Sequence, residues 1–284
     1  MISVLVLTRN EERDLPGCLE SVAWCDDIHV FDSLSTDRTV QVARDRGAHV
    51  AARAFDNYAS QRNAALATLP FRHPWLFILD ADERIPPELV PNLQAFVRSA
   101  TEGTDAARIR RRDFLFGRWL KHCQMSPYYI RLVRLGKVHY EREINEVLKV
   151  EGEVVDLPGH FDHFPFSKGV EHWFAKHNQY SSMEARELMK TRSGEYPLSL
   201  RTALFGRDFN ERRYHQKELF YRLPFRPLVK FLYLYGLRRG FLDGSAGFSY
   251  AAMASIYEYM ISVKVTELRL ASAGSPTPNR TEGR

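Results

Sequence analysis

The stretch that decides the fold is WLFILDADE, residues 75–83. Its apolar run, Trp75–Leu79, predicts a strand buried on both faces, as in a parallel sheet covered by helices. The acidic cluster Asp80-Ala81-Asp82-Glu83 follows at the point where this strand would end. Residues i and i+2 of a strand point to the same side, so the carboxylates of Asp80 and Asp82 can face one ligand.

The first hundred residues alternate between strand-like and helix-like patterns. The expected strands are Ser3–Leu7, Ile28–Phe31, Val50–Ala54 and Trp75–Leu79. The expected helices are Leu15–Trp24, Thr39–Arg46 with Ser35 or Thr36 as its cap, Tyr58–Leu69 and Pro86–Ala100. This alternation predicts an α/β fold, a doubly wound and mostly parallel sheet with helices on both faces.

Polar clusters follow three of the expected strands: Thr8–Glu11, Asp32–Asp37 and Asp80–Glu83. Ligands of doubly wound sheets bind beyond the carboxyl ends of the strands, so we expect these clusters to line one crevice. Asp32, which ends a strand, suits hydrogen bonds to a ribose or a base. Helix capping is the alternative for the first two clusters.

The paired carboxylates of Asp80 and Asp82 suit Mg²⁺ or Mn²⁺, which usually also take phosphate oxygens and water as ligands. A metal there would neutralise the charge that builds on a departing diphosphate. The alternative is a solvated acidic turn ahead of the helix that begins at Pro86.

The remaining chain changes character twice. Short strand-like pieces rich in Arg and aromatic residues occupy 105–153, and a helix is expected at Lys168–Lys190. The last third is helical, aromatic and basic, and the tail is rich in Ser, Pro and Thr. We therefore expect a catalytic domain at 1–168, a helical region at 169–270 and a disordered tail at 271–284.

Charge and cysteine usage narrow the class of protein. The net charge is +5, and residues 201–270 carry 12 Lys+Arg against 6 Asp+Glu, so this segment accounts for the whole excess. Its basic, aromatic stretch Phe220–Leu242 suits single-stranded nucleic acid, a membrane interface, or a core helix pair. Three cysteines without C-x-x-C spacing favour a reducing cytoplasm over a disulfide or zinc scaffold.

Several motifs, in this order and spacing, resemble the family-2 glycosyltransferases of GT-A fold: SVLVLTRNEE, FDSLSTDRT, SQRNAAL and FILDADE. Further motifs resemble the subgroup that includes lipopolysaccharide-core and related cell-surface glucosyltransferases. They are GRWLKH, RLVRL, INEVL, GHFDHF, WFAKHNQYS and FLDGSAGF.

The resemblance implies an inverting hexosyl transfer from a nucleotide-sugar, usually UDP-linked, with a divalent metal. It implies that Asp80 binds ribose or metal and that Asp82 binds the metal directly, with Glu83 as a bystander or helix cap. The implied nucleotide contacts are the base pocket of Thr8, Asn10 and Glu11, the uracil or ribose contact Asp32, and the phosphate contact Arg62.

Inversion requires a general base on the acceptor side of the anomeric carbon. Glu146, in INEVL, matches the subgroup's His-Glu position, although Asn145 replaces the usual His; Glu143 is the runner-up. His163 matches a late histidine that completes the metal site, with His160 as competitor and a packed structural role as the alternative.

Arg131, which matches the RLxR element, ranks first among the cations suited to clamp the diphosphate, ahead of Arg134 and Lys176. Solvated surface charges are the alternative for all three.

The resemblance also implies acceptors carried on lipid, so we expect the basic segment to contact an anionic membrane surface rather than nucleic acid. The expected partners are a nucleotide-sugar and a glycan or lipid-linked acceptor, and the expected location is the cytoplasmic, inner face of the membrane. A nucleotidyltransferase is the first competing class, but the loop TRNEE after the first strand has no glycine to cradle a triphosphate. A non-catalytic assembly protein is the second.

Overall fold

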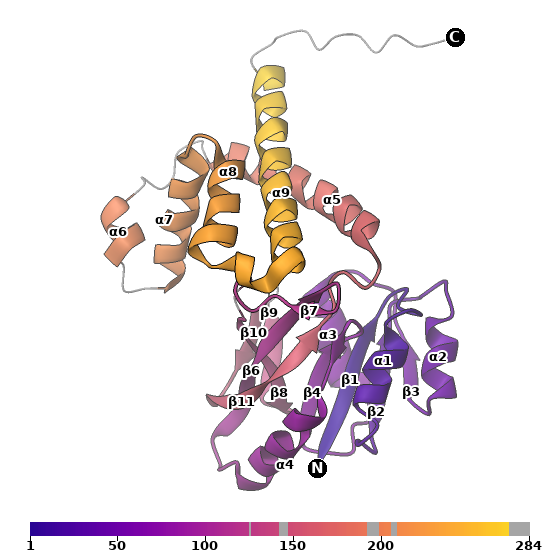
Figure 1. Ribbon diagram of the computed structural model, residues 1–284. Helices are drawn as coiled ribbons and strands as arrows, with labels where there is room; N and C mark the ends of the chain where they lie inside the picture. Colours follow the sequence, from indigo (N-terminus) through magenta and orange to yellow (C-terminus); the bar gives the residue numbers. More distant parts are fainter. Residues whose placement is uncertain (125, 142–146, 192–198, 206–208, 273–284) are drawn as a thin grey trace, which may run out of the picture. The chain divides into compact units, whose positions relative to one another are not determined.

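The computed structural model describes residues 1–124, 126–141, 147–191, 199–205 and 209–272 (Figure 1). The chain divides into two compact units. Unit 1 comprises residues 1–121 and 125–168, and unit 2 comprises residues 122–124 and 169–284. The predicted tail lies almost wholly outside the described residues.

Unit 1 is built on one large mixed sheet. In the described part of the chain its strands follow the order β3-β2-β1-β4-β8-β6-β11-β5, with β7 paired to β6. The strands are β1 (Ile2–Thr8), β2 (Ile28–Asp32), β3 (His49–Ala52), β4 (Trp75–Asp80), β5 (Glu83–Arg84), β6 (Thr104–Leu115), β7 (Arg118–Trp119), β8 (Tyr128–Arg134) and β11 (Glu153–His163).

The half of this sheet built from the first hundred residues is parallel. Strands β3, β2, β1 and β4 all run in the same direction. Strand β8 is antiparallel to both β4 and β6, and β11 is parallel to β6. The predicted α/β fold with a parallel nucleus is therefore confirmed, and the Arg-rich pieces after residue 104 extend it as a mixed half.

Helices cover both faces of the parallel half, as the alternating pattern predicts. On one face Phe77 and Leu79 belong to a core with α1 (Leu15–Ser21), α2 (Thr39–Asp45) and α4 (Val90–Ser99). On the other face Leu76 and Ile78 pack with α3 (Tyr58–Thr68) and a hairpin of β9 (Val138–Glu141) and β10 (Val147–Val150). A short η1 (Pro87–Leu89) precedes α4. The unbroken apolar run of β4 thus reflects burial on both sides.

The predicted cap of α2 is wrong. The backbone N–H of Thr39 donates instead to Asp37, whose Oδ1 lies 3.0 Å away. Ser35 and Thr36 are occupied by bonds to other loops, because the Ser35 hydroxyl accepts from the Asn10 N–H and Asn10 Oδ1 accepts from the Thr36 N–H.

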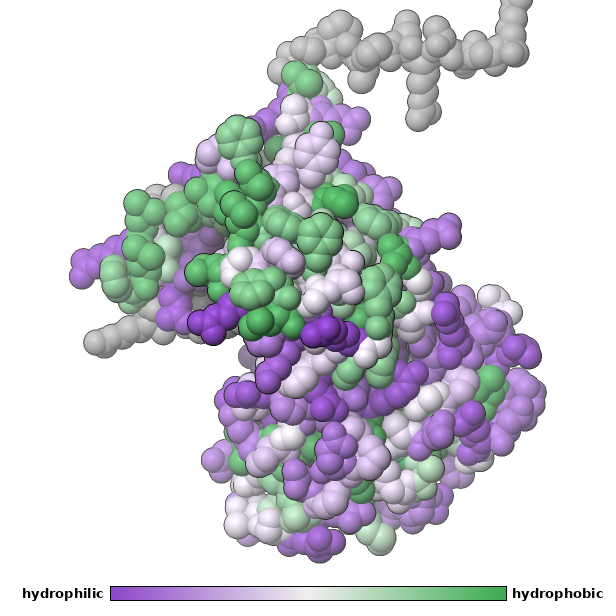
Figure 2. Space-filling view, in the orientation of Figure 1, coloured by the Kyte–Doolittle hydropathy of each residue, from purple (hydrophilic) through white to green (hydrophobic). Residues whose placement is uncertain are grey.

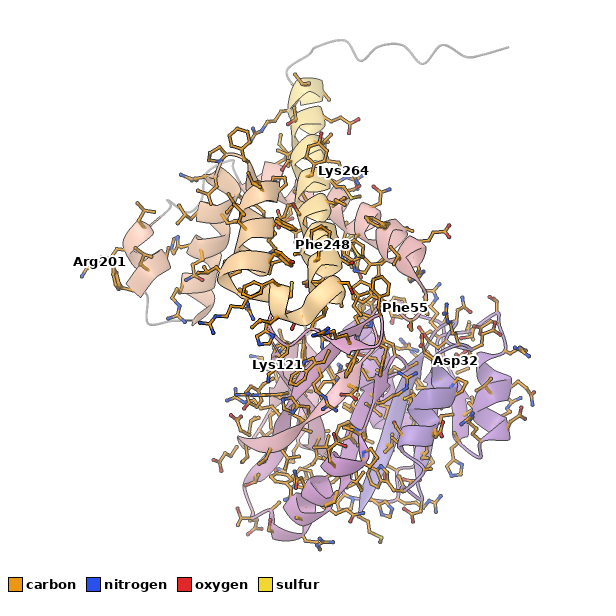
Figure 3. All side chains as sticks on the ribbon, viewed as in Figure 1. Asp32, Phe55, Lys121, Arg201, Phe248 and Lys264 are labelled. Atoms are coloured by element: carbon orange, nitrogen blue, oxygen red, sulfur yellow. The ribbon has the colours of Figure 1, made fainter. Side chains whose placement is uncertain are left out.

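The regular elements of unit 2 among the described residues are all helices. Its elements are α5 (Val170–Thr191), α6 (Leu200–Phe205), α7 (Phe209–Arg222), α8 (Arg226–Phe231), η2 (Leu232–Leu237), η3 (Gly240–Asp243) and α9 (Gly244–Ser272). Lys264 of α9 donates to Asn178, Ser181 and Ser182 of α5 (Figure 3). No helix among the described residues is both long enough and apolar enough to cross a membrane.

The FLDGSAGF motif of unit 2 has a packing explanation. Asp243 Oδ2 accepts from the backbone N–H groups of His122 and Cys123, at 2.9 and 2.7 Å. A Cβ atom at Gly247 would lie 2.0 Å from the carbonyl oxygen of Gly240, so only glycine fits there.

A buried carboxylate, Asp27, ties together the starts of the parallel strands. It accepts hydrogen bonds from the Ser3 hydroxyl, from His29 Nε2 and from Arg72. Burial alone would raise the pKa of Asp27, but these bonds outweigh burial and lower the pKa to about 2. The ionised form is therefore part of the folded state.

We predict that Asp27→Asn lowers the free energy of unfolding at pH 7 by on the order of 3 kcal/mol, because it removes a charge that three donors require. A depressed carboxyl pKa stabilises above the unfolded value of about 4 and loses that effect as pH falls toward the folded value. The difference between wild type and variant should therefore shrink as urea unfolding is repeated from pH 6 down to acid. Asp26→Asn, at an exposed neighbour paired with His73, is the control and should change stability far less.

Candidate functional site

The carboxyl ends of β1, β2 and β4 lie side by side at one edge of the sheet. Thr8 is in register with Asp32, and Leu7 is in register with Asp80. Asp32 is the last residue of β2 and therefore lies at this carboxyl-terminal edge (Figure 3). The polar clusters therefore follow strand ends that lie at one edge of the sheet, and a crevice lined by all three stays a prediction.

The loops after β1 and β2 are held together by side chains that the sequence singled out. Asp32 is 1% exposed and accepts from the Thr8 hydroxyl at 2.8 Å and from the Ser35 N–H at 2.7 Å. Asn10 has φ +55°, a conformation that Asn tolerates better than most residues. The Glu11 N–H donates to the Thr39 hydroxyl. Whether Asp32 also contacts a nucleotide stays a prediction.

Glu11 is the most perturbed acid of these loops. Burial raises its pKa to about 7, although the hydrogen bond from Lys168 acts in the opposite direction. Lys168 Nζ lies 2.6 Å from Glu11 Oε1 and 3.1 Å from the carbonyl oxygen of Asn10. The segment after β11 therefore contacts the loop after β1 through Lys168. Local sequence patterns do not predict this long-range contact.

Two residues of the acidic cluster form ion pairs with buried arginines; Glu83 is buried, whereas the side chain of Asp80 is 37% exposed. Asp80 Oδ1 accepts from Arg62 at 3.0 Å, and Asp80 Oδ2 accepts from Arg131 at 3.1 Å. Arg131 also donates to Glu83, and Glu83 in turn accepts from the Asp80 N–H. Both arginines are 7% exposed, and Glu83 is 1% exposed. We call Arg62, Asp80, Glu83 and Arg131 the ion cluster.

The pKa values within the ion cluster separate its two acids. Burial opposes ionisation of Asp80, but Arg62 and Arg131 outweigh it and hold its pKa well below the usual range. For Glu83 burial dominates and raises the pKa to about 7, although Arg131 acts against it. Arg131 is therefore a buried counter-ion of Asp80 and Glu83 rather than a surface charge. Glu83 does not cap the following helix, because its carboxylate is the buried partner of Arg131; that it takes no part in ligand binding stays a prediction.

Asp82 points to a different partner, His163 at the end of β11. His163 Nε2 lies 3.4 Å from Asp82 Oδ2, while Nδ1 lies 2.5 Å from Asp113 Oδ1. Burial lowers the pKa of His163, but the hydrogen bonds with Asp113 and Asp82 outweigh it and raise the pKa to about 9. The structure thus brings together two of the three predicted metal residues and adds Asp113, which sequence reasoning missed.

The other residues predicted for the site have different surroundings. Glu146, its runner-up Glu143 and the neighbouring Asn145 lie outside the described residues. Arg134 pairs with Asp105 at 3.2 Å, and its guanidinium lies 4.7 Å from the centroid of the Trp75 ring. His160 lies against Trp119, with ring centroids 5.5 Å apart. Lys176 belongs to unit 2, where it lies over Tyr180.

The fold and this edge define an α/β protein with a polar site at the carboxyl ends of parallel strands, where such sheets bind nucleotides. The family model described as "Glycosyl transferase family 2" matches residues 3–149, which is more than half of the 284 residues. The chain therefore belongs to glycosyltransferase family 2, and the predicted enzyme class is confirmed.

Two relatives of this chain are themselves named glycosyltransferases. The lipopolysaccharide core biosynthesis glycosyltransferase LpsC of Rhizobium meliloti is 29% identical over 93% of this chain and 91% of its own length. An uncharacterized glycosyltransferase of Rickettsia typhi, RT0209, is 24% identical over 95% of this chain and 88% of its own length. A crystal structure of glucosyl-3-phosphoglycerate synthase from Mycobacterium tuberculosis with Mn²⁺, UDP and glucosyl-3-phosphoglycerate has a TM-score of 0.34 and 25% identity. That match covers 39% of this chain and 44% of the synthase chain, less than half of its length.

The ion cluster yields a stability prediction. Arg131→Met removes the cation that Asp80 and Glu83 share and should lower the free energy of unfolding by about 3–5 kcal/mol, as expected when one partner of a buried pair is lost. Lys137→Met is the control, because both members of its ion pair with Glu151 are exposed, and it should change the free energy of unfolding far less. Equal losses in the two variants, measured by urea unfolding, would contradict the assignment.

Proposed function

We propose that the protein transfers a sugar, with inversion, from a UDP-sugar or another nucleotide-sugar to a hydroxyl of a cell-surface glycan or lipid-linked acceptor. Support for a donor site comes from the gathering of Thr8, Asp32 and Asp80 at one sheet edge. The likeness to LpsC supports an acceptor of the lipopolysaccharide kind. Glu146 is the proposed general base, on the strength of its motif.

The observation that carries the proposal is the pairing of Asp82 with His163. A carboxylate can only accept, so Asp113 fixes the proton of His163 on Nδ1. Because its pKa is raised to about 9, His163 carries a second proton on Nε2 near neutral pH, and a metal ion bound beside Asp82 would displace that proton. One oxygen and one imidazole nitrogen form a donor pair that suits Mn²⁺, whereas Mg²⁺ favours oxygen.

The residues present fit a divalent ion that also binds substrate. Within the described ranges no third carboxylate, histidine or thiol completes a metal-binding group, so diphosphate oxygens and water would fill the remaining positions. Such an ion would supply charge neutralisation for the departing diphosphate. Asp80 is less suited as a ligand, because each of its oxygens already accepts from an arginine.

The chain's own residues have separable roles in this proposal. Asp113 holds the imidazole of His163 in one orientation, and the ion cluster fixes the backbone from which Asp82 projects. Arg62 is the proposed nucleotide contact of the ion cluster, and its guanidinium lies 5.3 Å from the Tyr140 ring centroid. The proton of the acceptor hydroxyl would pass to Glu146 as the new glycosidic bond forms.

We predict that Asp82→Asn and His163→Ala each weaken Mn²⁺-dependent binding of UDP by at least about tenfold, a change equivalent to 1.4 kcal/mol. Titration calorimetry with UDP, in the presence of Mn²⁺ and of EDTA, measures this directly. His49→Ala, at the exposed start of β3, is the control and should bind as the wild type does. Unchanged binding in Asp82→Asn would refute its role as a ligand.

We also propose that unit 2 binds an anionic membrane surface from the cytoplasmic side. Large apolar side chains are exposed along its helices, including Phe205 (77%), Phe225 (80%) and Leu237 (78%). Figure 2 shows apolar residues gathered over α8 and α9 and mainly hydrophilic ones over unit 1. Basic residues such as Arg238 and Arg239 stand in the same segment, which suits an interfacial helix that meets lipid phosphates.

Flotation with liposomes tests this surface. Wild type should float with phosphatidylglycerol vesicles at low salt, and the fraction bound should fall as salt rises. The double variant Phe225→Ser, Leu237→Ser should lose most of the binding, whereas Tyr58→Ser, which removes an exposed ring from unit 1, should not. Absence of wild-type binding at low salt would end the proposal.

A further inference from the structure

One face of β6 carries a row of arginines. Arg108, Arg110 and Arg112 alternate with Ile109, which is buried in the core that includes α4. Alternate residues of a strand point to opposite faces, so the three arginines share the other face. On that face Arg110 is in register with Tyr128 of β8.

Aromatic rings and further polar groups complete this surface. On β11, His160 is in register with Arg110, and Asp162 is in register with Arg112. Trp119 of β7 lies under Arg112 and Lys121, whose charged groups are 5.7 and 5.6 Å from its ring centroid. We call this surface, formed by Arg110, Arg112, Trp119, Lys121, Tyr128 and His160, the arginine face; Lys121 is labelled in Figure 3.

Two of its cations have no acid partner. In the described part of the chain, Arg110 and Lys121 have no carboxylate within ion-pair distance, and each lies against a ring instead. The guanidinium of Arg110 is 4.8 Å from the Tyr128 centroid, a contact that orients its donors without neutralising the charge. The pKa of His160 is lowered by burial and then by Arg112 and Arg110, in keeping with a positive field here.

Other arginines of this surface are paired. Arg112 donates to Asp162 at 2.5 Å and to Glu88 at 3.3 Å, and Arg108 pairs with Asp156. The Arg108–Asp156 pair is exposed on both sides and contributes little to stability, so it is available to exchange partners with a ligand, whereas the Arg112–Asp162 pair is mostly buried. Carboxylate oxygens beside aromatic rings offer acceptors for hydroxyl groups, and the rings offer flat apolar surface for sugar C–H groups.

The arginine face lies on the same strands as His163 and Asp113. Asp162 and His163 are consecutive on β11, and Arg112 and Asp113 are consecutive on β6 in the same register. Neighbouring residues on a strand are roughly 3.3 Å apart and point to opposite faces, so the arginine face and His163 lie on opposite faces of the sheet. A chain of sugars on the arginine face would therefore reach His163 around the carboxyl end of β11.

We propose that the arginine face binds an anionic oligosaccharide, the part of the acceptor that precedes the hydroxyl to be glycosylated. This inference rests on the proposed function, which supplies the reason for a glycan beside the site. Single-stranded nucleic acid also stacks on rings beside cations, but Asp156, Asp162 and Glu88 would repel its continuous phosphate backbone. An acceptor with isolated acidic groups and many hydroxyls matches the mixed charges better.

The test uses the full-length protein and a fluorescently labelled heparin-derived tetrasaccharide, with chitotetraose as its uncharged counterpart. The wild type should bind the sulfated probe more tightly than chitotetraose, by fluorescence anisotropy at low salt. The double variant Arg110→Ala, Lys121→Ala should bind the sulfated probe roughly tenfold more weakly. Trp119→Ala should weaken both probes, because stacking does not depend on charge. Arg98→Ala, which removes an exposed arginine from α4, should change neither.

Three outcomes would overturn the inference: unchanged binding in the double variant, an equal loss in Arg98→Ala, or an Arg110-dependent preference for oligo(dT) or phosphatidylglycerol vesicles over the sulfated probe. Binding of UDP with Mn²⁺ is measured on the same variants and should be unchanged. Absence of UDP binding by the wild type would refute the proposed function. Absence of glycan binding by a wild type that binds UDP would refute only the glycan-binding role of the arginine face.

Discussion

The site of this protein depends on one interaction, the buried pairing of Arg131 with Asp80 and Glu83. These residues come from β8, β4 and β5, so their ion pairs fasten strands that are distant in the sequence. A buried acid without a counter-ion would cost more free energy than the fold gains from most single contacts. The charge of Arg131 therefore offsets the repulsion among the carboxyl groups of Asp80, Asp82 and Glu83 at the end of β4.

Because Arg131 and Arg62 occupy Asp80, the acidic cluster is divided in function. Asp80 and Glu83 face inward toward arginines, and Asp82 faces His163. The i and i+2 rule places Asp80 and Asp82 on one side only while the strand continues, and β4 ends at Asp80. The turn after Asp80 is what sends the two carboxylates to different partners.

The acidic cluster illustrates which features of the structure can be predicted from the sequence and which cannot. The strands and helices of the first hundred residues follow from local patterns, since β4 is apolar because both of its faces are covered. The convergence of Thr8, Asp32 and Asp80 follows from topology alone. Glu83, Asp113 and Lys168 were missed as site residues because their partners lie 48, 50 and 157 residues away, and no periodicity encodes such pairs. An Asp directly after three arginines, as in RRRD, was the only local signal for Asp113.

The charges at the carboxyl-terminal edge of the sheet explain why the proposed function includes a divalent metal ion. Asp80, Asp82 and Glu83 are opposed by Arg62 and Arg131, and Asp113 pairs with both His163 and Arg111. With these four acids ionised and His163 charged, the negative and positive charges sum to about zero before any ligand arrives. A nucleotide diphosphate would make the balance at this place negative. A divalent ion on Asp82 and His163 would supply positive charge at the atoms where the leaving group gathers charge.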